Sequence, residues 1–401
     1  MILKFEKSIL LLFLLMIFIA SGFKNDLVDL GSTMSVNWES FEVPSIVNFL
    51  KEKSSFLLGF SFLIFLYSIF KIKKIRVDKN YFILFYFILF SFAILRLFFG
   101  YFELSLKAVI SILILSSIYI MFSIYKNKYN LNIGELFLKT FYIFGFIFFL
   151  VNYYIYFSGM GYVYGFNRFF GSTAHPNFLG VQSAICFCLM SYYLFKGNYF
   201  IKFLSLLILF GFLYLVFLSG SRTALVFIFI YMYVSSLFFF RYKTLFILIS
   251  TIFFSFVYFI IDKFVFFLSS DVYDRGAGGS NTRSDAWLIM LNAIYERPFI
   301  GYGLFNGASE NSYFRLAANY GIFYAFFYIL LLIFALFSLV KKIKIKQDVN
   351  SRLMNCIFFG VFISLVTCGM LEGYLSDYFS IQMVVYFILL YLAGEKFNYV
   401  K

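Results

Sequence analysis

The chain has 401 residues, of which 63% are hydrophobic, 25% are aromatic and only 13% are charged, and its formal net charge is +14. Such a composition leaves too little polar surface to solvate a globule of this size, and the apolar runs of about 16 to 23 residues match the thickness of a bilayer. This excludes a water-soluble protein, and the lack of polar–apolar alternation excludes a transmembrane β-barrel. We therefore predict an all-α polytopic membrane protein.

The apolar runs predict twelve membrane-spanning helices within a single membrane domain of residues 1–401. In chain order they cover residues 6–23, 55–70, 81–99, 106–124, 136–158, 177–195, 203–218, 223–240, 244–262, 321–340, 353–371 and 378–394. The first run resembles a signal peptide, with Lys4 and Lys7 ahead of an apolar core and small residues behind it. Because that core is long and a second span follows, we favour an uncleaved helix over a cleaved leader.

Basic loops orient the predicted bundle by the positive-inside bias. With both termini in the cytoplasm, every basic cluster between spans falls on the inner face: Lys71/Lys73/Lys74/Arg76/Lys79, Lys126/Lys128, Lys196/Lys202, Arg241/Lys243 and Lys341/Lys342/Lys344/Lys346/Arg352. The net charge is thus mostly a matter of topology, and we expect the lipid bilayer, not nucleic acid, as the partner of these clusters.

The most polar stretch runs from about residue 271 to 321 and gathers nine charged residues and seven glycines. We place it in a large extracytoplasmic loop, about 263–320, that contains short helices and carries the candidate site. A capping box starts an amphipathic helix that ends before Pro298. The residues that define this helix are Thr282, Arg283, Ser284 and Asp285 in the box and Trp287, Met290, Leu291 and Ile294 in the apolar stripe.

Arginines are costly near a membrane unless they are paired or functional. The predicted outer side nevertheless carries Arg168, Arg222, Arg275, Arg283, Arg297 and Arg315. Because a guanidinium presents a fixed fork of donors that matches phosphate oxygens, the group suits an anionic headgroup. For any single arginine, snorkelling to lipid phosphates or capping a helix is an equal alternative.

Three of these arginines have recognisable local settings. Arg168 precedes the segment 171–177, where Pro176 falls in the first turn of the sixth span and backbone N–H groups face outward. Arg222 lies in the tight turn 219–223 between two spans. Arg283 lies in the first turn of the amphipathic helix, where a cation opposes the helix dipole, so anion binding is the more natural role.

Cysteine and histidine indicate no metal or disulfide chemistry. All the cysteines lie inside predicted spans, and the chain has one histidine, so neither a disulfide framework nor a histidine-rich metal site is expected. We interpret the cysteines, Cys186, Cys188, Cys356 and Cys368, as small core residues.

The order of these motifs resembles the O-antigen polymerase and O-antigen ligase superfamily. The resemblance is carried by the helix with Arg283 and Trp287, by a Pro-x-x-Gly-x-Gly turn at 298–303, and by the polar pair Glu310-Asn311 with Tyr313 after it. The Arg168 loop, the Ser-Gly-Ser-Arg turn and the helix opened by Gly321 fit the same pattern. The resemblance covers most of the chain, and its specificity lies in the order of the motifs.

The resemblance implies a metal-independent glycosyltransferase without a cofactor, which uses undecaprenyl-diphosphate-linked oligosaccharides on the outer face of the bacterial cytoplasmic membrane. Ligases of the superfamily usually carry histidine before the asparagine, where this chain has Glu310. That difference favours a Wzy-type polymerase that joins repeat units of a capsule, O-antigen or exopolysaccharide. A chain-length regulator and a flippase would be further partners.

The expected catalytic residues are Glu310, Arg222 and Arg283. The arginines would stabilise the departing diphosphate, and Glu310 would take the proton of the attacking sugar hydroxyl, unless it binds substrate or caps a helix. The expected substrate-binding residues are Arg168, His175, Asn177, Asn311, Tyr313 and Arg315.

Structural roles compete at several of these positions. For His175 and Asp285 we prefer the role of a helix cap or turn residue, and Asn311 and Tyr313 are alternatively explained as the start of a helix. Glu372 and Asp377, in the last outer loop, can bind an acceptor sugar, but their spacing does not single them out. Two other functions remain open, an O-antigen ligase and a lipid-linked oligosaccharide flippase. A flippase should carry charges along its spans, which here hold few besides Arg96 and Lys139.

Overall fold

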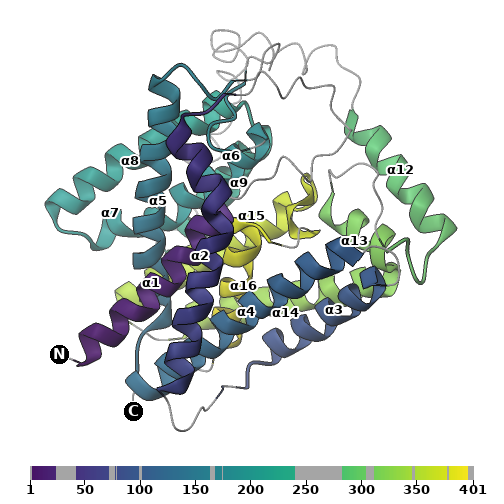
Figure 1. Ribbon diagram of the computed structural model, residues 1–401, viewed down its shortest axis with the longest axis horizontal. Coiled ribbons are helices and arrows are strands. Elements are labelled where there is room, and N and C mark those ends of the chain that lie inside the picture. Colours follow the sequence, from purple (N-terminus) through teal and green to yellow (C-terminus); the bar gives the residue numbers. More distant parts are fainter. Residues whose placement is uncertain are drawn as a thin grey trace.

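The computed structural model describes residues 2–23, 42–71, 77, 79–98, 102–162, 168–173, 175–239, 282–303, 311–345, 348–376 and 379–395, with the backbone alone at 2–4, 102–105, 282–284 and 376. The regular elements of this part of the chain are helices (Figure 1). They are α1 (Ile2–Gly22), α2 (Ser45–Phe70), α3 (Tyr81–Phe98), α4 (Phe102–Tyr129), α5 (Ile133–Phe157), α6 (Pro176–Met190), α7 (Tyr192–Lys196), α8 (Tyr199–Ser219), α9 (Arg222–Phe239), α12 (Thr282–Glu296), α13 (Ser312–Tyr320), α14 (Ile322–Lys344), α15 (Val349–Cys368), η3 (Gly373–Ser376) and α16 (Ile381–Gly394).

Ten helical segments in the described ranges are long and apolar enough to cross a membrane, and α16 is a shorter apolar helix. This confirms the predicted all-α membrane fold. The predicted span 244–262 lies outside the described residues. Several helices begin or end a few residues from the predicted bounds, and two differences are larger. The helix α2 begins at Ser45 instead of residue 55, because a helix can include polar residues before its apolar run starts. The predicted span 177–195 is divided at Ser191 into α6 and α7.

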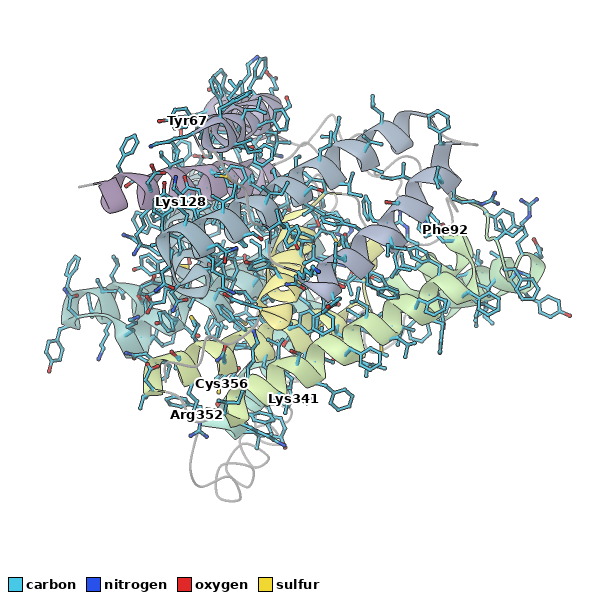
Figure 2. The ribbon with its side chains drawn as sticks, turned by 90° about the horizontal axis from the view of Figure 1, so that it is seen from below. Tyr67, Phe92, Lys128, Lys341, Arg352 and Cys356 are labelled. Atoms are coloured by element: carbon cyan, nitrogen blue, oxygen red, sulfur yellow. The ribbon has the colours of Figure 1, made fainter. Side chains whose placement is uncertain are left out.

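One end of the bundle gathers basic side chains at the starts and ends of several helices. We call it the basic end and define it by Lys71, Lys126, Lys196, Lys342 and Arg352. Lys126 pairs with Glu395 beyond α16 at 3.0 Å, and Arg352 at the start of α15 donates to the carbonyl of Phe238 in α9 at 2.9 Å. In Figure 2, Lys128 and Arg352 lie toward the left of the view, Lys341 lies near its middle and Phe92 of α3 lies toward the right.

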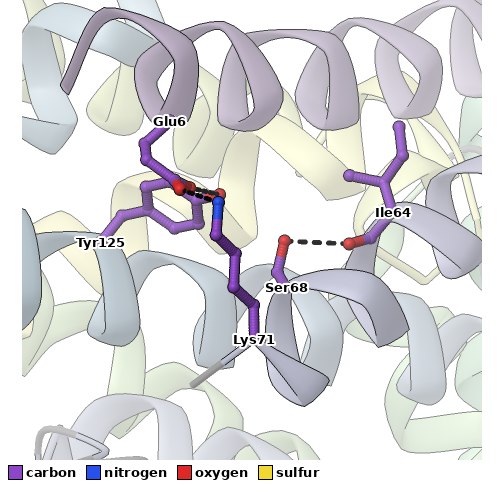
Figure 3. Close-up of polar contacts among 5 residues, drawn as sticks. All are labelled: Glu6, Ile64, Ser68, Lys71 and Tyr125. Atoms are coloured by element: carbon purple, nitrogen blue, oxygen red, sulfur yellow. Dashed lines mark hydrogen bonds and ion pairs between the residues drawn. The ribbon is translucent and has the colours of Figure 1, made fainter. Parts of the chain in front are cut away.

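A buried carboxylate ties α1 to the bundle at the basic end (Figure 3). Glu6, whose side chain is 3% exposed, forms an ion pair with Lys71 and accepts a hydrogen bond from the hydroxyl of Tyr125 at 3.2 Å. The hydrogen bond to Glu6 raises the pKa of Lys71 above its ordinary value. Further along α1, the ring of Phe18 packs on Phe141 of α5 at 5.3 Å, so α1 is part of the core.

The helix α16 runs through the middle of the bundle, and all its residues from Ile381 to Ala393 are buried (Figure 1). Side chains of other helices satisfy the carbonyls of its last turn, which have no partner within the helix. Asn80 donates to Tyr391 at 2.9 Å, Lys342 donates to Leu392, and Ser338 donates to Ala393 at 2.7 Å. The last carbonyls of this fourteen-residue helix are thereby hydrogen-bonded inside the protein instead of by water.

The two helices of the polar loop are joined to the bundle through a glycine turn. The turn after α12 bonds back to the α13–α14 junction, with Tyr302 N donating to Ala318 O at 2.8 Å and Ile322 N to Pro298 O at 2.7 Å. Gly301 has a left-handed φ of 64° and lies against the backbone of Asn319, where a Cβ would overlap. Arg96 of α3 donates to the Gly301 carbonyl at 2.9 Å, which explains this arginine in an apolar span.

Candidate functional site

The ends of four helices meet at the side of the bundle opposite the basic end. These are the starts of α6, α9 and α13 and the end of α15. The orientation follows from α9 and α15, since the end of α9 meets the start of α15 at the basic end and Thr223 at the start of α9 meets Glu372 just beyond α15. Most of the predicted site residues that the structure describes lie here.

The start of α6 is shaped by His175 and Pro176. His175 is the N-cap, and its Nδ1 accepts a hydrogen bond from Asn177 N at 3.1 Å, while Pro176 occupies the first helical turn. A proline is favoured there because its missing N–H would have no helical partner. The structure therefore gives His175 the capping role that competed with substrate binding.

Arg168 connects this helix start to the end of α8. Its Nη2 donates to the Oδ1 of Asn177 at 2.6 Å and its Nε donates to the carbonyl of Ser219 at 2.7 Å. Both bonds are charge-assisted, and they use the planar fork that lysine lacks. Two predicted substrate-binding residues are thus in direct contact with each other.

The turn between α8 and α9 presents Arg222. Gly220 ends α8 with a left-handed φ of 60°, and Ser221 Oγ accepts from Ala224 N at 3.3 Å. The predicted turn is confirmed. Arg222 is the first residue of α9 and its side chain is exposed. A cation at a helix N-terminus opposes the helix dipole. An anion bound there would be attracted both by the Arg222 guanidinium and by the N-terminus of α9.

Glu372 links α6 and α9. Its Oε1 accepts from Asn177 Nδ2 at 3.1 Å and from Thr223 Oγ1 at 2.9 Å. Its backbone carbonyl accepts from the Ser312 hydroxyl at the start of α13 at 2.6 Å. We call Arg168, Asn177, Thr223, Ser312 and Glu372 the helix-start cluster. Within it Arg168 and Thr223 are joined through one amide and one carboxylate.

The start of α13 is held against α15. Asn311 is the N-cap, accepting from Tyr313 N at 2.9 Å and Phe314 N at 3.1 Å, and the Tyr313 hydroxyl donates to the Val366 carbonyl at 2.6 Å. Burial raises the pKa of Tyr313 above its ordinary value, so the phenol stays protonated. Asn311 and Tyr313 therefore complete a helix start, the structural alternative predicted for them.

Arg315 lies on α13 and is partly buried. Its Nε is buried without a hydrogen-bond partner among the described residues, and so is the indole Nε1 of Trp287 on α12. The Trp287 ring packs edge-on against Phe314 at 5.8 Å. Met290 is buried, whereas Leu291 is 43% exposed, so the predicted apolar stripe of α12 is only partly covered by protein.

Two predicted catalytic groups are not in the described part of the chain. Glu310 and the side chain of Arg283 lie outside the described residues. In the ranges that are described, no three histidine, cysteine, aspartate or glutamate side chains are grouped so as to hold a metal ion. The cysteines Cys186, Cys188, Cys356 and Cys368 are buried free thiols, as expected for core residues.

Sequence reasoning did not select Glu372, Thr223 or Ser312. In the sequence, Glu372 is an acid of the last predicted outer loop without a distinctive spacing, Thr223 falls in the predicted turn 219–223, and Ser312 has no feature that selects it. Thr223 and Glu372 are separated by 149 positions, and Asn177 and Glu372 by 195. No spacing rule connects residues so far apart, so only the packed structure could bring them together.

The fold and this site define a multi-pass membrane protein with a polar, arginine-bearing cluster at one end of its helices. Residues 203–329 match the family model Wzy_C, described as O-antigen ligase. The chain therefore carries a Wzy_C domain, which confirms the predicted superfamily, a family of glycan-transferring ligases and polymerases. Comparison with curated proteins finds no match.

The matched segment supplies one part of the helix-start cluster. Thr223 and Ser312 fall within residues 203–329, together with Arg222, whereas Arg168, Asn177 and Glu372 fall outside it. The hydrogen bonds of Glu372 to Asn177 and Thr223 therefore join the matched segment to the rest of the bundle.

Proposed function

We propose that this protein is a polysaccharide polymerase that joins undecaprenyl-diphosphate-linked oligosaccharide repeat units on the outer face of the bacterial cytoplasmic membrane. The observation that carries the proposal is the arrangement of Arg168 and Arg222 beside the meeting helix starts, in a chain with a Wzy_C domain. Guanidinium groups and helix N-termini both favour phosphate. The basic end would then face the cytoplasm, with both termini.

The proposed reaction is an attack by a sugar hydroxyl of one repeat unit on the anomeric carbon of the next. A C–O bond to the new sugar forms, the bond to the lipid diphosphate breaks, and the hydroxyl proton passes to a base. Arg222 and Arg283 would stabilise the charge on the leaving diphosphate, and Glu310 would accept the proton. Arg168, Arg315 and Asn177 would contribute to the substrate-binding surface, with His175, Asn311 and Tyr313 holding the helix starts that form it.

A ligase that passes a finished glycan to another acceptor is the second candidate, because the family description is O-antigen ligase. Glu310 in place of the histidine usual in ligases favours the polymerase. The two functions differ in what accumulates when the enzyme fails. A defective polymerase leaves single repeats on the lipid, whereas a defective ligase leaves long chains there. A chain-length regulator and a flippase would act beside the polymerase.

The test is polymerisation of a lipid-linked repeat unit by the purified protein in vesicles. We expect Arg222→Ala, Arg283→Ala and Glu310→Gln each to leave single repeats, with a loss of at least about a hundredfold for a group that acts in the transition state. Arg352→Ala is the matched control, because Arg352 lies at the basic end, where it donates to the Phe238 carbonyl at 2.9 Å. Normal chain length in all three variants would contradict the proposal.

A further inference from the structure

The carboxylate of Glu372 accepts hydrogen bonds from two helix starts, each of which lies beside an arginine of the proposed site. Asn177 at the start of α6 donates to Oε1 at 3.1 Å and, through its own Oδ1, accepts from Arg168 at 2.6 Å. Thr223 at the start of α9 donates to the same oxygen at 2.9 Å and follows Arg222 directly in the chain.

The orientation of Asn177 depends on this carboxylate. An amide side chain can be turned by 180° with little change in shape, which exchanges its oxygen and its nitrogen. With Glu372 as an acceptor on one side, the nitrogen must face Glu372, so the oxygen faces Arg168. Because the Arg168 guanidinium can only donate, both neighbours favour this orientation, and Glu372 holds the amide nitrogen on the side away from Arg168.

Thr223 receives the same kind of constraint. Its hydroxyl bonds to Glu372 while its backbone carbonyl lies 3.7 Å from the Cys368 thiol of α15. The first turn of α9 is thus attached to the end of α15 at two points, and Arg222 is part of that turn. The backbone that carries Arg222 depends on the same contacts.

The segment that bears Glu372 is itself firmly held. The Glu372 carbonyl accepts from Ser312 Oγ at 2.6 Å, the same Oγ accepts from Leu375 N at 3.1 Å, and Ser312 N donates to Gly369 O at 2.8 Å. The carboxylate therefore projects from a turn fixed between α13 and α15, as a positioning group requires.

From these contacts we infer that Glu372 is a positioning residue that sets Arg168, through Asn177, and Arg222, through Thr223, in register for one diphosphate group. The inference rests on the proposed function for the identity of the ligand. It assigns to Glu372 no proton transfer, so it predicts an effect on diphosphate binding that a general base would not produce.

The test measures binding of undecaprenyl diphosphate, without sugars, to the protein in nanodiscs at fixed ionic strength. Glu372→Gln and Glu372→Ala both remove the negative charge, so any electrostatic gain toward the anion is common to both. Glu372→Gln keeps an acceptor oxygen and Glu372→Ala does not. We expect Glu372→Ala to bind at least about tenfold more weakly than Glu372→Gln, as for the loss of about one charge-assisted hydrogen bond.

A second pair covers the case in which Glu372→Ala does not fold. Thr223→Val removes the hydroxyl with little change of shape, and Thr223→Ser keeps it. We expect Thr223→Val to bind the diphosphate about tenfold more weakly than Thr223→Ser, by the same reasoning. Glu395→Gln, the same substitution at the basic end, should bind like the wild type.

Equal diphosphate binding by the two variants of each pair would overturn the inference. A Glu372→Gln variant that binds diphosphate like the wild type but has lost all turnover would also overturn it, because that is the behaviour expected if Glu372 were a base. The pH dependence of polymerisation adds a second readout. If Glu372 transfers no proton, the loss of activity at acid pH should be the same in Glu372→Gln as in the wild type. If the wild type forms no polymer while the binding differences appear, the proposed function fails and the positioning role stands. If it forms polymer and the differences are absent, the positioning role fails.

Discussion

Arg168 and Asn177 are joined by a hydrogen bond of 2.6 Å, from Nη2 to Oδ1, across the start of α6. The same guanidinium donates through Nε to the carbonyl of Ser219, at the end of α8. One side chain therefore sets the distance between the α6 start and the turn that presents Arg222. A residue selected as a ligand for phosphate also serves as a structural bridge.

Arg168→Lys should separate these roles. Lysine keeps the positive charge but lacks the fork that makes both hydrogen bonds. We expect polymer formation to fall at least about tenfold and the free energy of unfolding to fall by roughly 1–3 kcal/mol, because a buried carbonyl or amide oxygen loses its donor. Chain length and thermal unfolding in detergent are the measurements. Arg352→Lys, at the basic end, serves as control, and equal effects of the two substitutions would show that charge alone matters at position 168.

Gly180→Ala should disturb the approach of α6 to the turn between α8 and α9. A Cβ at position 180 would lie 2.5 Å from the Ser221 Cβ and 2.8 Å from the Ser219 Oγ. Such overpacking costs about 1–3 kcal/mol. We expect lower stability and slower polymerisation, measured by thermal unfolding and by product length.

Gly59→Ala is the matched control for that substitution. Gly59 also lies inside a helix, but a Cβ there meets nothing within 4 Å. Alanine is favoured over glycine in a helix by about 1 kcal/mol, so Gly59→Ala should be neutral or stabilising. Equal effects at the two positions would contradict the close contact at Gly180.

Lys342→Met should destabilise the protein without changing the reaction. Lys342 is 8% exposed and donates to the Leu392 carbonyl in the last turn of α16. Methionine fills the space but leaves that carbonyl without its donor, at a cost of about 1–3 kcal/mol. Thermal unfolding should show this loss, while the length of polymer per active protein stays unchanged. The neighbouring Lys341 is exposed, so Lys341→Met should have little effect, and comparable losses would count against the prediction.

Tyr313 should contribute to the pH dependence of stability on the alkaline side. Its folded pKa lies above the ordinary value of 10.0 because the packing of the protein around the phenol removes much of its water. The unfolded chain then loses the proton first, so stability is full below about pH 10 and declines as the pH rises toward the folded pKa. Tyr313→Phe should lessen this alkaline decline, as followed by unfolding between pH 7 and pH 11 in detergent.

The same substitution also has an effect near neutral pH. Tyr313→Phe leaves the Val366 carbonyl without its donor, which should cost about 1–3 kcal/mol, while the pH profile of polymerisation keeps its shape. Tyr295→Phe is the control, since Tyr295 is 88% exposed on α12. A shifted alkaline limb of activity in Tyr313→Phe would contradict the buried, protonated state of the phenol.

The membrane fold was predictable because it depends on local hydrophobicity. A run such as Tyr81–Phe98 must be helical in a bilayer, whatever its neighbours, since its backbone groups have no other partners there. Local signals also predicted the turn at Gly220 and the proline in the first turn of α6, both of which the structure contains. Helix ends were less predictable where polar residues continue the helix, as in the first turns of α2.

The sequence by itself thus determined a helical membrane protein, the side of the bundle that gathers lysine, and the motifs that mark a Wzy_C domain. The tertiary structure decided that Glu372, in the turn after α15, accepts hydrogen bonds from Asn177 at the start of α6 and from Thr223 at the start of α9. Hydrophobic periodicity and helix capping depend on residues that are close together in the sequence, so they can be read from it. A carboxylate shared between helices far apart in that order exists only after the helices have packed.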